Sequence, residues 1–200
     1  MVTGPLATDT TAYVSRYGPQ NLQVTHVLQG VRDYVGQAAT VHYAKGCEVV
    51  DATWPESEII PTPLTEEERL EIQEAVEKAR RSDVVIAVLG EDEHRVGESK
   101  SRTGLALPGR QLQLLQALYE TGKPIVLVLI NGQPLTINWE NRYIPAILEA
   151  WFPNSIGGQT IAETLFGEYN PGGKLPVTFP KTLGPVSYTH LRAHETRHDL

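Results

Sequence analysis

Two unbroken apolar runs limit the folds that this chain can adopt. Val84–Leu89 consists of Val, Ile, Ala and Leu alone, and Pro124–Ile130 is apolar throughout. A strand that is apolar on both faces is typical of a parallel sheet covered by helices on each side. Strand-like and helix-like segments also alternate along the chain, as they do in such folds. We therefore predict an α/β fold: a three-layer sandwich with a mostly parallel sheet of about five or six strands and helices on both faces.

Helix signals lie between the predicted strands. Leu22–Val35 has apolar residues at helical spacing, and Gly36 follows as a stop. Thr65 and Glu68 fit a capping box at the start of a second helix. The other predicted elements are strands at Thr40–Ala44 and Ala146–Trp151, a helix from Pro108 to Gly122, a helix Ile156–Phe166 capped by Asn154 and Ser155, a surface loop over Glu48–Pro63, and a short final strand within Asn170–Pro180.

The charge and apolar content exclude several classes of partner. The chain has 24 acidic residues against 17 Lys and Arg, a net charge of −7. Nucleic acids and anionic membranes both need a basic face, so we expect neither as a partner. No run reaches the roughly 18 apolar residues of a membrane span. The single cysteine, Cys47, excludes an internal disulfide and is interpreted as a small buried hydrophobe.

A loop rich in carboxylates follows the first apolar run. After Gly90 come Glu91, Asp92, Glu93 and Glu98. Ligands of open α/β sheets bind beyond the carboxyl ends of the strands, which is where this loop is predicted to lie. Carboxylates are also the working groups of glycoside hydrolysis. The loop is therefore the candidate functional site.

The two ends of the chain differ from the rest of the predicted domain. No signal peptide is visible, and the opening residues resemble the end of a strand, so we expect the chain to begin inside a domain. Residues 187–200 contain His194, Glu195 and His198 in a formal HExxH zinc motif, but no third ligand can follow it. We interpret residues 187–200 as a non-native read-through tail and residues 1–186 as one domain. No metal and no other cofactor is predicted.

Several short segments occur in a characteristic order over residues 2–186. They are Tyr43-Ala-Lys-Gly-Cys47, Ser82-Asp-Val-Val85, Gly90-Glu91, Gly97-Glu98-Ser99, Leu107-Pro108 with Gln111, Thr121-Gly-Lys-Pro124, Asn131-Gly132, Trp151-Phe152-Pro153, Gly157-Gly158 and Asn170-Pro-Gly-Gly-Lys-Leu-Pro176. Together they resemble the C-terminal α/β-sandwich domain of glycoside hydrolase family three, which includes β-glucosidases and β-xylosidases.

The resemblance implies a retaining, exo-acting β-glycosidase that hydrolyses terminal non-reducing β-D-glycosyl residues, most often glucose. Its aspartate nucleophile would come from a separate N-terminal barrel domain, and its acid/base glutamate from this domain. The matching glutamate is Glu98, with Glu91 as a reserve. The isolated chain would be inactive, and the full-length enzyme would be periplasmic or extracellular.

Further loop residues are candidates for binding a β-linked glucoside or short oligosaccharide. These are His94, Ser99, Lys100 and Arg102. Lys100 and Arg102 could instead orient the loop or be solvated cations. A general acid needs a raised pKa, and a retaining pair lies only ~5–5.5 Å apart. We therefore expect Glu98 to be exposed until a barrel closes over it.

Other classes remain as alternatives. The chain could be a non-catalytic carbohydrate-binding or structural module. A nucleotide-binding domain is disfavoured because the sequence has neither GxGxxG nor GxxxxGK[ST], and a serine hydrolase because it has no GxSxG. Trp151 and Phe152 could stack on a sugar, although packing is the favoured interpretation. Gly157-Gly158 is interpreted as close packing of a helix against a strand, not as an anion site.

Overall fold

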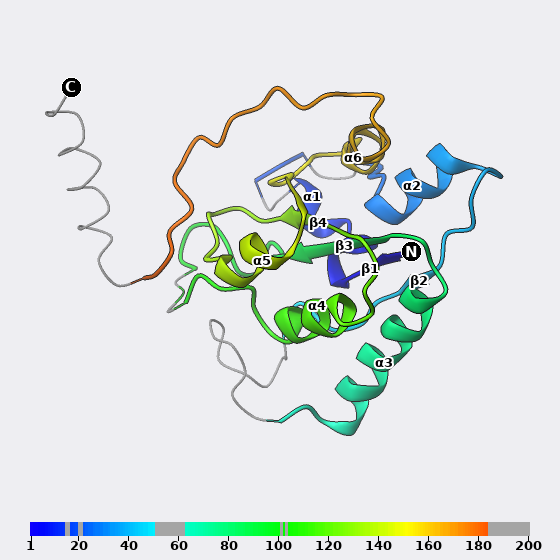
Figure 1. Ribbon diagram of the computed structural model, residues 1–200. Coiled ribbons are helices and arrows are strands. Elements are labelled where there is room, and N and C mark those ends of the chain that lie inside the picture. The colour runs from blue at the N-terminus through cyan, green and yellow to red at the C-terminus, as the bar shows by residue number, and fades with distance from the viewer. Residues whose placement is uncertain (15–16, 20–21, 51–62, 101, 103, 184–200) are drawn as a thin grey trace, which may run out of the picture.

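A parallel sheet of five strands forms the middle layer of the molecule (Figure 1). The computed structural model describes residues 1–14, 17–19, 22–50, 63–100, 102 and 104–183. The strand order is β2-β1-β3-β4-β5, and every neighbouring pair is parallel. The strands are β1 Val2–Thr3, β2 Tyr43–Ala44, β3 Val85–Gly90, β4 Ile125–Ile130 and β5 Ala146–Glu149.

Helices cover both faces of this sheet, as predicted. In Figure 1 one face carries α2 Val27–Val35 and α6 Gly157–Leu165, and the other carries α3 Glu66–Arg80 and α4 Gln111–Tyr119. Three short helices complete the described elements: η1 Pro5–Ala7, α1 Thr11–Val14 and α5 Asn138–Tyr143.

The side chains of the central strand β3 alternate between two hydrophobic cores. Ala87 and Leu89 pack with apolar residues of α3 and α4, including Leu114. Ile86 and Val88 pack with residues of α2 and α6 on the opposite face. The alternation follows from the two-residue period of a strand, and it explains why β3 must be apolar at every position. The three-layer sandwich predicted from the apolar runs is therefore confirmed.

Local signals fix two helix ends as predicted. The Thr65 hydroxyl accepts the Glu68 N–H at 3.2 Å, and the Glu68 carboxylate accepts the Thr65 N–H at 2.7 Å, which completes the capping box of α3. Gly36 ends α2 with a φ of 51°, a backbone conformation that favours glycine.

Two predicted helix starts and one predicted strand are wrong for identifiable reasons. The helix α4 begins at Gln111 and not at Pro108, because Gly109 has a φ of 62° and interrupts the helical backbone. Asn154, with a φ of 65°, does not cap α6, which follows Ile156 without a side-chain cap. The described part of the 170–183 segment contains no strand, and Pro176 and Pro180 there lack the N–H that pairing requires.

The close packing expected at Gly157-Gly158 occurs, but against a different partner. A Cβ on Gly30 of α2 would lie 2.0 Å from the Gly158 carbonyl oxygen, and the Gly158 N–H donates to the Thr25 carbonyl at 2.8 Å. The glycines therefore join α6 to α2 and to the residues before it, not to a strand. Residues 22–26 contain no helix, and the Thr25 backbone is hydrogen-bonded to Ser155 and Gly158 at the start of α6, so α2 begins later than predicted.

Some predictions fall beyond what can be described. Most of the predicted surface loop, residues 51–62, lies outside the described residues, as do the HExxH motif and the whole of residues 187–200. Cys47 is buried, with 2% of its surface exposed, as expected of a small hydrophobe.

Candidate active site

The site begins where β3 ends, at a glycine held by neighbouring chains. Gly90 has a φ of 139°, and a Cβ there would lie 1.9 Å from the Ile130 carbonyl oxygen of β4. The side-chain amide of Gln111, on α4, accepts the Gly90 N–H at 2.8 Å and donates to the Gly90 carbonyl at 2.9 Å. Because two elements hold this residue, the loop leaves the sheet in a fixed direction.

Glu91, the first residue of the loop, is buried beside Arg102. Glu91 is fully buried, and only 3% of the Arg102 side chain is exposed. The two side chains form an ion pair. Gln133, which follows β4, donates to Glu91 Oε1 at 3.1 Å. Arg102 also donates to the Ala106 carbonyl at 2.8 Å. The two ends of the loop are thus joined inside the protein, and we call this pair, Glu91 with Arg102, the loop clasp.

Glu98 lies in a turn at the exposed tip of the same loop. Gly97 and Ser99 both have positive φ values, 111° and 63°, and the Lys100 N–H donates to the Gly97 carbonyl at 3.1 Å. Glu98, Ser99 and Lys100 are all exposed. The backbone N–H of Glu98 donates to the Tyr17 hydroxyl at 2.7 Å, which ties the turn to a distant part of the chain.

His94 lines a cavity at the same edge of the sheet, close to Asp92. The Asp92 carboxylate accepts the His94 N–H at 3.0 Å. Burial raises the pKa of Asp92 above its ordinary value, and His94 opposes that rise. The cavity measures about 420 Å³ and is also lined by Asp9, Lys45 and Glu48. It lies beyond the ends of β1, β2 and β3, where the strand order reverses and ligands of such sheets bind.

The structure thus divides the predicted site residues into three places. Glu91 and Arg102 are inside the clasp, His94 is in the cavity, and Glu98, Ser99 and Lys100 are on the exposed turn. Within the described ranges, no group of three or more His, Cys, Asp or Glu side chains is placed to hold a metal.

Sequence reasoning missed the side chains that support the loop. Gln133 and Tyr17 belong to none of the motifs that mark the site, and Gln111 belongs to one of the short family segments. Gln133 carried a usable signal, because it closely follows the second apolar run and the ends of parallel strands meet at one edge. Tyr17 carried none. The two aromatic residues Trp151 and Phe152 both pack against other residues. A Cβ on Gly132 would lie 2.8 Å from the Phe152 ring, and the ring centroids of Trp151 and Phe179 are 5.9 Å apart.

The fold is an α/β domain that presents a carboxylate-bearing loop at the carboxyl edge of its parallel sheet. The glycosyl hydrolase family 3 C-terminal domain matches residues 1–199. The chain belongs to this family and forms that domain.

Curated relatives support the assignment over most of the chain. A periplasmic β-glucosidase of Salmonella typhimurium is 42% identical over 95% of the chain and 26% of its own length. A β-xylosidase of Formosa agariphila is 39% identical over 82% of the chain and 21% of its own length. The chain therefore spans about a quarter of the relatives that it matches.

Solved structures agree with the fold. A β-glucosidase from Erythrobacter marinus superposes with a TM-score of 0.78 at 35% identity, covering 92% of the chain and 26% of that protein. A β-glucosidase from Listeria innocua in complex with isofagomine gives 0.75 at 32% identity, covering 92% of the chain and 23% of that protein. Among the described residues, no helix is long and apolar enough to span a membrane.

Proposed function

We propose that this domain supplies the general acid/base, Glu98, to a retaining, exo-acting β-glycosidase. The observation that carries the proposal is the construction of the loop: its base is closed by the buried clasp, while its tip presents Glu98 outward at the carboxyl edge of the sheet. The greater length of the relatives supports a further domain, and we propose a barrel there that supplies the nucleophile.

The chemistry divides between the two carboxylates. The glutamic acid would protonate the glycosidic oxygen as it leaves, while the nucleophile of the barrel attacks the sugar. The resulting glutamate would then take a proton from the water that breaks the covalent intermediate. An acid must be protonated at working pH, which requires burial or a nearby negative charge. Closure of the barrel over the exposed turn would supply both.

Glu91 fits this role less well than Glu98. Its carboxylate is inaccessible and faces the guanidinium of Arg102, which favours the ionised form. A group held in this state is poorly placed to donate a proton to a substrate. The clasp also supports an orienting role for Arg102, whereas His94, Ser99 and Lys100 remain candidates for contacts with sugar hydroxyls.

The substrate that we propose is a β-D-glucoside or a short β-linked oligosaccharide. The relatives from Salmonella and Listeria are named β-glucosidases, and the Formosa relative is a β-xylosidase. We also propose a periplasmic or extracellular location for the full-length enzyme, because the Salmonella relative is named as periplasmic.

A chimera tests the acid/base role. Residues 1–183 of this chain would replace the matching domain of the Salmonella β-glucosidase, and turnover of an aryl β-glucoside would be measured. We expect Glu98→Ala to lower kcat about 10²–10⁴-fold, and azide to restore breakdown of the intermediate by attacking it without a general base.

Two controls make the result specific. Glu93→Ala, in the same loop, should leave turnover unchanged. The 200-residue chain alone should show no turnover, because the nucleophile is expected elsewhere. Retained activity of the Glu98→Ala chimera would reject the proposal and favour a non-catalytic carbohydrate-binding or structural module.

A further inference from the structure

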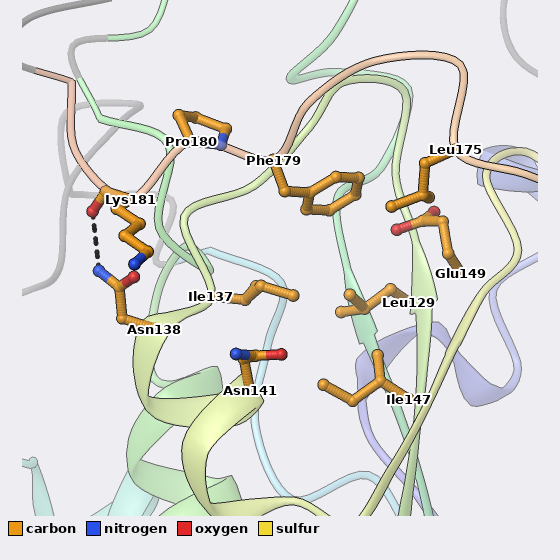
Figure 2. Close-up of a pocket in the computed structure, with 10 residues that line it drawn as sticks. All are labelled: Leu129, Ile137, Asn138, Asn141, Ile147, Glu149, Leu175, Phe179, Pro180 and Lys181. Atoms are coloured by element: carbon orange, nitrogen blue, oxygen red, sulfur yellow. Dashed lines mark hydrogen bonds between the residues drawn. The ribbon is translucent and has the colours of Figure 1, made fainter. Parts of the chain in front are cut away.

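A second cavity lies near the β5 edge of the sheet. It is bounded by β4, β5, α5 and the segment 175–181 (Figure 2). Its volume is about 410 Å³, within the ~300–1,000 Å³ range of ligand pockets. Its lining is mainly apolar: Leu129, Ile137, Ile147, Leu175, Phe179 and Pro180. It shares no described lining residue with the cavity that contains His94.

Glu149, the last residue of β5, directs its carboxylate into this apolar space (Figure 2). One oxygen, Oε1, accepts the Trp151 N–H at 3.0 Å. The other, Oε2, is buried and has no hydrogen-bond partner among the described residues. A buried carboxylate oxygen without a partner is costly, so a donor that reached it would be strongly favoured.

The charges around the cavity leave Glu149 without a cation. The described lining residues from β4 and α5 include no titratable group, and those of the 175–181 segment include Lys181 alone. Lys181 is exposed, and Figure 2 shows it beside Asn138, at the end of the cavity away from Glu149. Its carbonyl accepts a hydrogen bond from the Asn138 side chain at 2.8 Å.

We propose that this cavity binds a small organic ammonium ion with an apolar body. The body would lie among Ile137, Ile147 and Phe179, and an N–H of the ammonium would donate to Oε2 of Glu149. Charge complementarity favours a cation over a neutral ligand, because a charged donor on a buried carboxylate forms a stronger hydrogen bond. The proposal does not depend on the glycosidase activity or on Glu98.

The test uses the 200-residue chain and benzylamine, which stays protonated near neutral pH, with binding measured by calorimetry. Burial raises the pKa of Glu149 to about 7, and the hydrogen bond from the Trp151 N–H and the nearby Asn131 side chain lower it by less. The carboxylate fraction therefore rises about tenfold between pH 6 and pH 8, and the affinity should rise by the same factor.

Matched variants and a matched probe make the test decisive. Glu149→Gln should weaken benzylamine binding at pH 8 at least tenfold and abolish its pH dependence, whereas Glu67→Gln, exposed on α3, should change neither. Phe179→Ala should weaken binding at each pH while keeping the tenfold ratio, and it gives a second readout if Glu149→Gln does not fold.

Two results would overturn the proposal. One is the absence of benzylamine binding at millimolar concentration at pH 8. The other is equal binding of benzyl alcohol, which has the same shape without the charge; that result would make the cavity a general apolar pocket.

Discussion

Glu91 and Glu98 lie in one loop, yet their surroundings are opposite. Glu91 is fully buried, paired with Arg102 and bonded to Gln133, whereas Glu98 is exposed in a turn. The same residue type thus serves as an internal fastening at the base of the loop and as an outward group at its tip. The difference predicts that the clasp stabilises the loop, whereas the acid/base role proposed for Glu98 requires the exposed tip.

The largest expected effect comes from breaking the clasp. Glu91→Ala leaves the Arg102 guanidinium buried without its counter-charge, so the free energy of unfolding should fall by about 3–5 kcal/mol. Urea unfolding of the 200-residue chain, followed by circular dichroism, measures this change. A loss below about 1 kcal/mol would mean that the clasp is not formed or is wet in solution.

A double-mutant cycle isolates the pair itself. Arg102→Met should cost about as much as Glu91→Leu, since each leaves one buried charge, but the double variant should cost much less than their sum. We expect a coupling energy of about 2–3 kcal/mol from the four urea curves. Additive effects of the two substitutions would show that Glu91 and Arg102 act independently.

Glu149 tests what burial does to a carboxylate without an arginine. Burial raises its pKa from 4.5 to about 7. Between these values the folded chain holds a proton that the unfolded chain has lost, so this residue makes stability fall as the pH rises through that window. After allowance for partial exposure, the loss should be about 1–2 kcal/mol. The free energy of unfolding should be measured at several pH values between pH 4 and pH 8. Its decrease with pH should be smaller in Glu149→Gln than in the unmodified chain, and an equal decrease would contradict this prediction.

The smallest expected effect is at the tip. Glu98→Ala should change the free energy of unfolding by no more than about 0.5 kcal/mol, as is usual for an exposed side chain. Set against the large loss of turnover expected in the chimera, this would separate function from stability within one loop. A destabilisation comparable with that of Glu91→Ala would remove the contrast between base and tip.

The elements of the fold that depend on neighbouring residues could be predicted from the sequence. The apolar runs identified β3 and β4, and the Thr65–Glu68 spacing identified the start of α3, because these patterns involve neighbouring residues alone. The short strands β1 and β2 have two residues each, and their pairing depends on partners far along the chain. Their order in the sheet was not available from any local pattern.

The loop that carries the site could be predicted from the sequence, but the positions of its side chains relative to one another could not. The carboxylates after Gly90 marked the loop, and the exposure expected for Glu98 agrees with its place in the turn. The burial of Glu91 could not be foreseen, because it depends on Arg102 returning to the loop base and on Gln133 arriving from the next strand. The cavity around Glu149 depends likewise on the 175–181 segment crossing α5 and β5.

The position of β1 has a consequence for the way this domain must assemble. β1 lies inside the sheet, between β2 and β3, although it precedes both of them in the chain. The Ile86 N–H donates to the Met1 carbonyl at 2.8 Å, a contact between residues 85 positions apart in the chain. Contacts of such sequence separation slow folding, because a long loop must close before they form. The pairing of β1 with β3 is therefore expected to be among the last to form. Until it forms, one edge of β3 is unpaired and can bind a wrong strand.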